Sequence, residues 1–217
     1  MRLYIIIMSR IKEIFIYSDC PSNSLSVPEV IDYLRETGFS AEYRGNFFEF
    51  LDLAKEEAQE LTRKIAGTRV LDISTPLDEV REPIYGEIGV ELRRLKGEAS
   101  TLGVLYDGLW LQRIFYKIIY EKIKGELGSG FIHIIFTGRL FGTFETGDSL
   151  KTLPPFDPAQ DKLDSYPRSP RYHARVILTG LPSLISTSGI VEAPARPKDY
   201  YWLKAGFIRA GKDVREL

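Results

Sequence analysis

The sequence predicts an α/β protein with a mixed sheet, flanking helices and a Pro-rich strand-and-loop C-terminal half. Short apolar runs typical of buried strands alternate with amphipathic helical stripes over the first 137 residues. Beyond that point the composition changes, since eight of the twelve prolines fall between Pro154 and Pro197. We therefore expect one α/β domain over 1–217, with a β-α-β-α-β-α half over 1–130 and a strand and long-loop half over 131–217.

The first predicted strand is IKEIFIYSD, residues 11–19, which alternates and then runs apolar. A helix is expected after it, because Ser26 and Glu29 have the spacing of a capping box. The apolar stripe of this helix ends at Gly38, and FSAEYRG, residues 39–45, is the second predicted strand.

A long amphipathic helix is predicted next, closed by Gly67, with apolar positions at Phe47, Phe50, Leu51, Ala54, Ala58, Leu61 and Ile65. TRVLDIS, residues 68–74, is typical of a short buried strand. Prolines and glycines interrupt residues 75–97, whose last part, LRRLKG, fits either a strand or a final helical turn. The strongest helical stripe ends near Gly125 and comprises Leu111, Ile114, Phe115, Ile118, Ile119 and Ile123.

Composition excludes several classes of protein. A net charge of -1 argues against bulk electrostatic binding to nucleic acid or to an anionic membrane. The lone Cys20 excludes an internal disulfide and a cysteine-cluster metal site, so a cytoplasmic setting is expected. No apolar run reaches the ~18 residues of a transmembrane helix. Two Asn and three Gln beside many charged residues are typical of a thermophile, and Met8 is an alternative start to Met1.

Both histidines lie in apolar runs that predict strands, FIHIIFTGRLF and YHARVILTG. On a strand, His133 would share a face with Phe131 and Ile135, and it could approach His173 if the two strands paired. Two imidazoles and a carboxylate form a legitimate zinc or iron set. The loop between the histidines offers Glu145, Asp148, Asp157, Asp161 and Asp164 as carboxylates. The alternative is a pair of hydrogen-bonded structural histidines, which the lack of a diagnostic spacing favours.

Three further features have both a functional and a structural interpretation. Thr137-Gly138-Arg139 resembles a phosphate-cradling turn but lacks a P-loop pattern, which favours a glycine-bent hairpin. Arg168, Arg171 and Arg175 could clamp a phosphate or carboxylate, or could pair with the aspartates of their own loop. Glu192, between apolar neighbours, is a candidate acid or base if buried, or a partner of Arg196.

HIIFTGRLFGTFE and RYHARVILTGLPSLISTSGIVEAPARPKDYY carry a resemblance over residues 131–202. This stretch resembles an archaeal family classed as metallopeptidases, which is akin in outline to the archaemetzincins. The resemblance implies a mixed α/β sheet beside a metal-bearing helix with H-E-x-x-H, a pattern that this sequence lacks. Either the resemblance is one of fold alone, or the metal-bearing part lies beyond Leu217.

Two functions follow as hypotheses. If the resemblance extends to activity, it implies metal-assisted hydrolysis of a peptide or amide, with zinc held by His133 and His173 and with Glu145 or Glu192 as base. The alternative is a non-catalytic module that binds a small anionic ligand or a protein partner through Arg168, Arg171 and Arg175.

Overall fold

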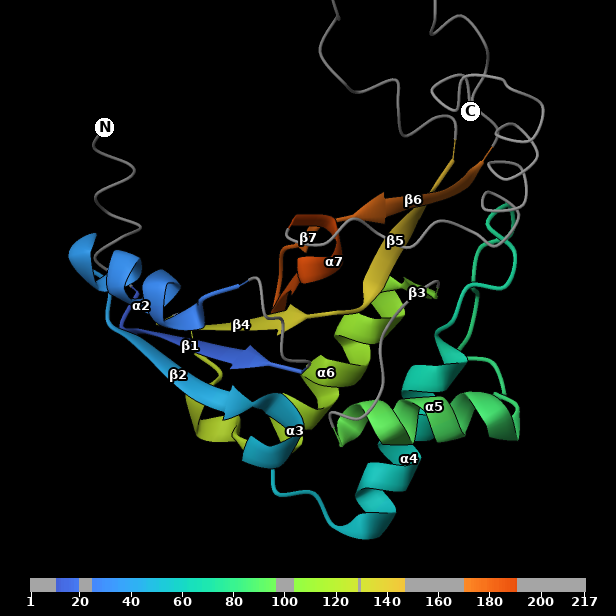
Figure 1. The fold of residues 1–217 in the computed structure, drawn as a ribbon, viewed down its shortest axis with the longest axis horizontal. Helices are drawn as coiled ribbons and strands as arrows, with labels where there is room; N and C mark the ends of the chain where they lie inside the picture. Colours follow the sequence, from blue (N-terminus) through green and yellow to red (C-terminus); the bar gives the residue numbers. More distant parts are fainter. Residues whose placement is uncertain (1–10, 20–24, 97–103, 129, 147–169, 191–217) are drawn as a thin grey trace, which may run out of the picture.

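The computed structural model describes residues 11–19, 25–96, 104–128, 130–146 and 170–190 (Figure 1). Its larger sheet has the strand order β2-β1-β4-β8-β7. The strands β1 (Glu13–Ser18), β2 (Ala41–Asn46), β4 (Phe131–Thr137) and β8 (Ser183–Ser186) run parallel. The edge strand β7 (Ile177–Leu178) is antiparallel. Because the four long strands share a direction, their carboxyl ends meet at one edge of the sheet (Figure 1).

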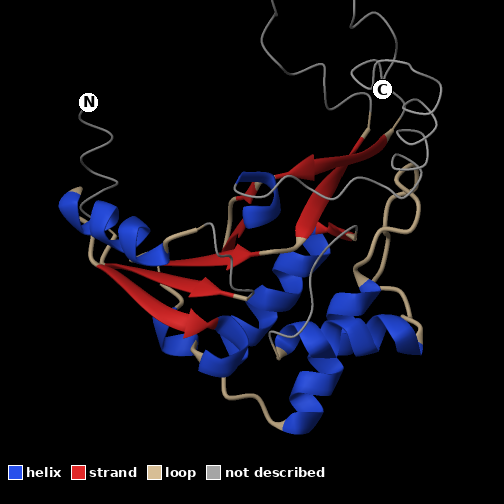
Figure 2. Ribbon diagram, in the orientation of Figure 1, coloured by secondary structure: helices blue, strands red, loops and turns tan. Residues whose placement is uncertain are grey.

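Helices cover both faces of this sheet, as Figure 2 shows with helices in blue and strands in red. Helix α2 (Val27–Glu36) packs on the face that carries Ile14, Ile16 and Phe136. The opposite face carries Phe15, Tyr17, Ile135 and Leu184. Helices α3 (Phe47–Phe50), α4 (Lys55–Gly67) and α6 (Gly108–Lys122) pack there. The central strand β1 is therefore buried on both faces, which is why its sequence runs apolar without alternation.

A second, smaller sheet has the order β3-β5-β6. Strand β3 (Leu105–Asp107) pairs in parallel with β5 (Leu140–Glu145), and β5 pairs antiparallel with β6 (Arg171–Arg175). The chain passes from β4 in the large sheet to β5 in the small one through Gly138 and Arg139 alone. This two-residue connection fixes how the two sheets meet.

The remaining helices lie beside these sheets: α3 (Phe47–Phe50), α4 (Lys55–Gly67), α5 (Tyr85–Leu95), α6 (Gly108–Lys122), the 3-10 turn η1 (Lys124–Glu126) and α7 (Thr187–Ile190). Helix α6 begins at Gly108 because the Asp107 carboxylate accepts a hydrogen bond from the Trp110 amide. Its apolar stripe, with Leu111, Phe115 and Ile119, lies in the core. Among the described residues, no helix combines the length and apolar character needed to cross a membrane.

The predicted α/β class, with a mixed sheet and flanking helices, is confirmed. The predicted faces of β4 are also confirmed, since Ile135 lies in the core on the side of His133 whereas Phe136 lies on the other side. Ser26 does precede α2, but its side chain makes no capping hydrogen bond.

Three local predictions are wrong, and one that the sequence left open is settled. The helix predicted from Phe47 to Ile65 is two helices, because Asp52 takes a left-handed conformation (φ 44°) between α3 and α4. Residues 68–74 form no strand beyond one bridge from Arg69 to Tyr106. The Asp72 carboxylate turns the chain there by accepting from Ser74 and Thr75. The run 172–180 is divided between β6 and β7, which belong to different sheets. Residues 85–95 are helix α5, so the helical alternative for LRRLKG holds over residues 92–95.

Leucine truncations test this assignment of core and surface. We expect Leu111→Ala to lower the free energy of unfolding by about 2–5 kcal/mol, because Leu111 is fully buried and its removal leaves a cavity. The matched control is Leu71→Ala, within the segment predicted as a buried strand. Leu71 is 75% exposed, so its loss should cost less than about 0.5 kcal/mol. Urea denaturation measures both, and equal losses would contradict the fold.

Candidate functional site

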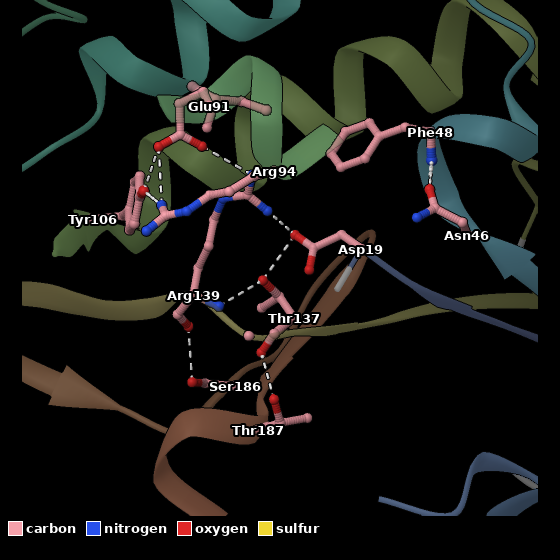
Figure 3. Close-up of polar contacts among 12 residues, drawn as sticks. Asp19, Asn46, Phe48, Glu91, Arg94, Tyr106, Thr137, Arg139, Ser186 and Thr187 are labelled. Atoms are coloured by element: carbon pink, nitrogen blue, oxygen red, sulfur yellow. Dashed lines mark hydrogen bonds and ion pairs between the residues drawn. The ribbon is translucent and has the colours of Figure 1, made fainter. Parts of the chain in front are cut away.

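Polar side chains follow the parallel strands at the edge where their carboxyl ends meet. Asp19 follows β1, Asn46 ends β2, Thr137 ends β4 and Ser186 ends β8 (Figure 3). From β1 the chain crosses to β2 on one side, whereas β4 and β8 lie on the other side, so the strand order reverses between β1 and β4. Open α/β sheets bind ligands outside the carboxyl ends at such a reversal. We call Asp19, Thr137, Arg139, Ser186 and Thr187 the carboxyl-edge cluster.

Asp19 lies at the reversal itself and is 1% exposed. Its Oδ2 accepts a hydrogen bond from Thr137 Oγ1 at 2.8 Å and contacts the guanidinium of Arg139. Within the described part of the chain, its Oδ1 has no hydrogen-bond partner. Burial raises the pKa of the Asp19 carboxyl, and Arg139 and Thr137 offset this only in part. The site thus contains a buried acid with one oxygen held and one oxygen to which no described residue donates.

Arg139 joins the carboxyl-edge cluster to helix α5. Its guanidinium contacts Asp19 on one side and lies 3.0 Å from Glu91 Oε2 on the other. Glu91 is fully buried, and its Oε1 accepts from Arg69 Nη2 at 2.6 Å, Arg94 Nη1 at 3.0 Å and the Tyr106 hydroxyl at 2.5 Å. Burial opposes ionisation of Glu91, but the guanidiniums of Arg139, Arg94 and Arg69 outweigh it and lower the pKa. Glu91 is therefore an ionised carboxylate enclosed by donors.

Three consecutive hydroxyls hold the turn between β4 and β5. Ser186 Oγ donates to the Arg139 carbonyl at 2.8 Å, Thr187 Oγ1 to the Thr137 carbonyl at 3.2 Å and Ser188 Oγ to the Gly138 carbonyl at 2.6 Å. We call these three residues the hydroxyl clamp. Thr137-Gly138-Arg139 is therefore not the glycine-bent hairpin that the sequence favours, because β4 and β5 lie in different sheets. The turn instead presents Arg139 to the buried acids.

His133 is buried against Phe15 and Tyr17. Its Nε2 lies 3.1 Å from the Glu126 carbonyl oxygen, which can only accept, so Nε2 carries the proton. Its Nδ1, 3.2 Å from the Tyr17 hydroxyl, is then the acceptor. Both nitrogens are used in this arrangement, so a metal at His133 would have to displace Tyr17 or the carbonyl. His133 and His173 also lie on strands that do not pair.

Four of the predicted site residues meet on the small sheet. Glu145 lies opposite Arg171 in the β5–β6 ladder, and His173 and Arg175 follow Arg171 on the same face. His173 Nε2 is 3.9 Å from Glu145 Oε2, and Arg175 pairs with Glu145 while donating to Thr143 Oγ1 at 2.9 Å. The other predicted residues, Arg168, Glu192 and Arg196 with the loop aspartates Asp148, Asp157, Asp161 and Asp164, lie outside the described residues.

The described residues do not by themselves fit a catalytic metal. A catalytic zinc takes three protein ligands and keeps one position open. Within the ranges that the structure describes, no three His, Cys, Asp or Glu side chains are grouped to hold a metal ion. At the carboxyl-edge cluster the acids also lie among the guanidiniums of Arg69, Arg94 and Arg139, and this cationic setting opposes a divalent cation.

Sequence reasoning singled out Thr137 and Arg139 as part of a candidate phosphate-cradling turn, but it missed Asp19 and the partners on α5. Asp19 and Thr137 carry a usable signal, because each is a polar residue at the end of a buried strand. Glu91 and Arg94 carry almost none, since Gly86 and Gly89 hide the helix on which they lie. Arg139 stands out in the sequence only as part of the turn after β4.

Burial of His133 has a measurable effect on pH dependence. Desolvation lowers its pKa, and the bond to the Glu126 carbonyl offsets this only in part. Below the unfolded pKa of about 6.5, the unfolded chain therefore takes up a proton that the folded chain refuses. We expect this to reduce stability as pH falls from about 6.5 towards the folded pKa, by up to about 1.4 kcal/mol per pH unit.

The test is urea denaturation of the wild type and two variants between pH 7 and 5.5. His133→Gln, whose amide can donate and accept, should show a smaller loss of stability on acidification than the wild type. His173→Gln is the control and should keep the His133 contribution. An unchanged pH dependence in His133→Gln would contradict the assignment.

Comparison with known proteins gives a match to a protein family. No curated protein and no solved structure matches the chain. The family described as the Probable metallopeptidase family (DUF6775) matches residues 10–150 and 165–216, which include every residue of the carboxyl-edge cluster. The chain therefore belongs to this probable metallopeptidase family.

Proposed function

We propose that the protein hydrolyses peptide or amide bonds and that it holds its substrate at the carboxyl-edge cluster. Family membership supports the class of reaction. The convergence of Asp19, Thr137 and Arg139 at the strand-order reversal is the observation that supports the place. A kinship with the archaemetzincins, implied by the resemblance of residues 131–202, belongs to the same proposal.

Zinc enters this proposal through the family and not through the described residues. His173 and Glu145 are the predicted ligand and base that lie together in the structure, with 3.9 Å between Nε2 and Oε2. Their side chains are only partly buried, at 23% and 18% exposure, and Glu145 also pairs with Arg175. A complete set would need further donors. A substrate held at the carboxyl-edge cluster would also have to extend along β5 to reach the zinc, because Arg139 precedes this strand and Glu145 ends it.

The alternative, an anion-binding module, has less support. Arg171 and Arg175 do share a face of β6, as a clamp would need. Arg175 is already engaged by Glu145 and Thr143, however, and Arg168 lies outside the described residues. The arginine cluster therefore serves at least in part to pair with a carboxylate of its own sheet.

Metal content and hydrolysis of the full chain, purified without a tag, test the proposal. We expect about one zinc per chain by mass spectrometry of the elements, and cleavage of a mixed peptide digest that a chelator abolishes. His173→Ala should lose zinc, because it removes an imidazole that is open to solvent. His133→Gln is the matched control and should keep zinc, because both nitrogens of His133 bond to the protein. Wild type without zinc and without cleavage would contradict the proposal.

A further inference from the structure

We propose that Asp19 contacts the ligand directly, with Oδ1 accepting a hydrogen bond from an uncharged N–H group such as a peptide main chain presents. The choice of a peptide as the source of that N–H group rests on the proposed function. The site and the polarity of the contact rest on the structure alone.

Asp19 Oδ1 is a buried oxygen without a hydrogen-bond partner among the described residues. Asp19 is 1% exposed, so water does not freely solvate its carboxylate. Oδ2 is held by Thr137 and Arg139, and the Gly138 amide also interacts with the carboxyl and lowers its pKa. No described residue, however, makes a hydrogen bond to Oδ1. Buried polar atoms are almost always hydrogen-bonded, and leaving one unpaired destabilises the fold. An unpaired acceptor of this kind, at the end of an interior strand, indicates a donor that arrives with a ligand.

The direction in which Asp19 Oδ1 points is fixed by the contacts of the neighbouring residues. Thr137 Oγ1 both donates to Asp19 and accepts from the Arg139 amide at 3.0 Å, so it is fixed on two sides. The hydroxyl clamp holds the carbonyls of the same turn. With Oδ2 held by residues that are themselves held, Oδ1 is presented in one orientation (Figure 3). Residues that contact a ligand in a defined geometry need supporting contacts of this kind behind them.

The charges around Asp19 limit which kind of donor can approach Oδ1. A negative group is disfavoured at Oδ1, because the ion pair with Arg139 favours the carboxylate form of Asp19 and an ionised carboxylate oxygen only accepts hydrogen bonds. A positive group such as an ammonium is disfavoured, because Arg139 contacts Asp19 and Arg94 lies in the same network. The remaining donors are uncharged N–H and O–H groups. Among these, the amide of a peptide is the donor that a peptide-hydrolysing protein meets.

The position of Asp19 in the sheet also favours a contact with a ligand. Asp19 lies between β1 and β4, where the strand order reverses and α/β sheets bind their ligands. Because Asp19 is covered, contact requires the surrounding chain to open, so association is expected to be slower than a diffusion-limited encounter.

The experiment uses the full chain and N-acetyl-trialanine methylamide, a peptide with no charged end. We expect this probe to raise the melting temperature of the wild type, since it binds the native state, and to associate slowly in stopped-flow measurements. Acetate and methylammonium at equal concentration should give no comparable rise. In Asp19→Asn, whose amide can place a donor at the Oδ1 position, affinity should fall at least tenfold. Asp32→Asn is the control, because Asp32 is an exposed aspartate on α2.

Three results would overturn the inference: no rise in the wild type with the peptide, an equal rise in Asp19→Asn, or a rise with acetate or methylammonium as large as that with the peptide. If Asp19→Asn does not fold, the Asp19 carboxyl carbon of the wild type, assigned by NMR through the backbone, replaces it. That resonance should shift when the peptide is added, and a fixed resonance would overturn the inference. Asp19-dependent binding without hydrolysis or zinc would contradict the proposed function and leave this inference standing.

Discussion

The structure depends on one buried ionic interaction, in which Arg139 lies between the carboxylates of Asp19 and Glu91. The three residues come from the end of β1, the turn after β4 and helix α5. Burying charges away from water is costly unless their partners are well placed, and removing one partner leaves an uncompensated charge. The network therefore constrains where the large sheet, the small sheet and α5 lie with respect to one another.

This constraint also shapes the candidate site. Arg139 can reach both acids because its turn is only two residues long and the hydroxyl clamp holds the carbonyls of that turn. The same turn carries Thr137, which orients Asp19. A structural network and a ligand position thus share residues at the carboxyl edge of the sheet. The ion pairs hold these side chains in fixed positions, and a binding site needs its side chains in fixed positions.

How much of this could be predicted from the sequence depends on the range of the interactions. Strands β1 and β4 could be predicted because burial on both faces leaves a continuous apolar run, and α6 because its stripe is regular. The break at Asp52 could not, since a single left-handed residue leaves the apolar spacing intact on either side. The ion network could not either, because Asp19 and Arg139 are 120 positions apart and nothing local links them. The histidines, prominent in the sequence, take places on strands of different sheets.

A double-mutant cycle between Arg139 and Glu91 tests the central role of the network most directly. The free energies of unfolding of Arg139→Met, Glu91→Gln and the double variant would be measured by urea denaturation. The network predicts that each single change costs about 3–5 kcal/mol and that the double change costs well below their sum, with a coupling of about 2–3 kcal/mol. Losses that add within about 0.5 kcal/mol would show that the two side chains act independently and would contradict this account.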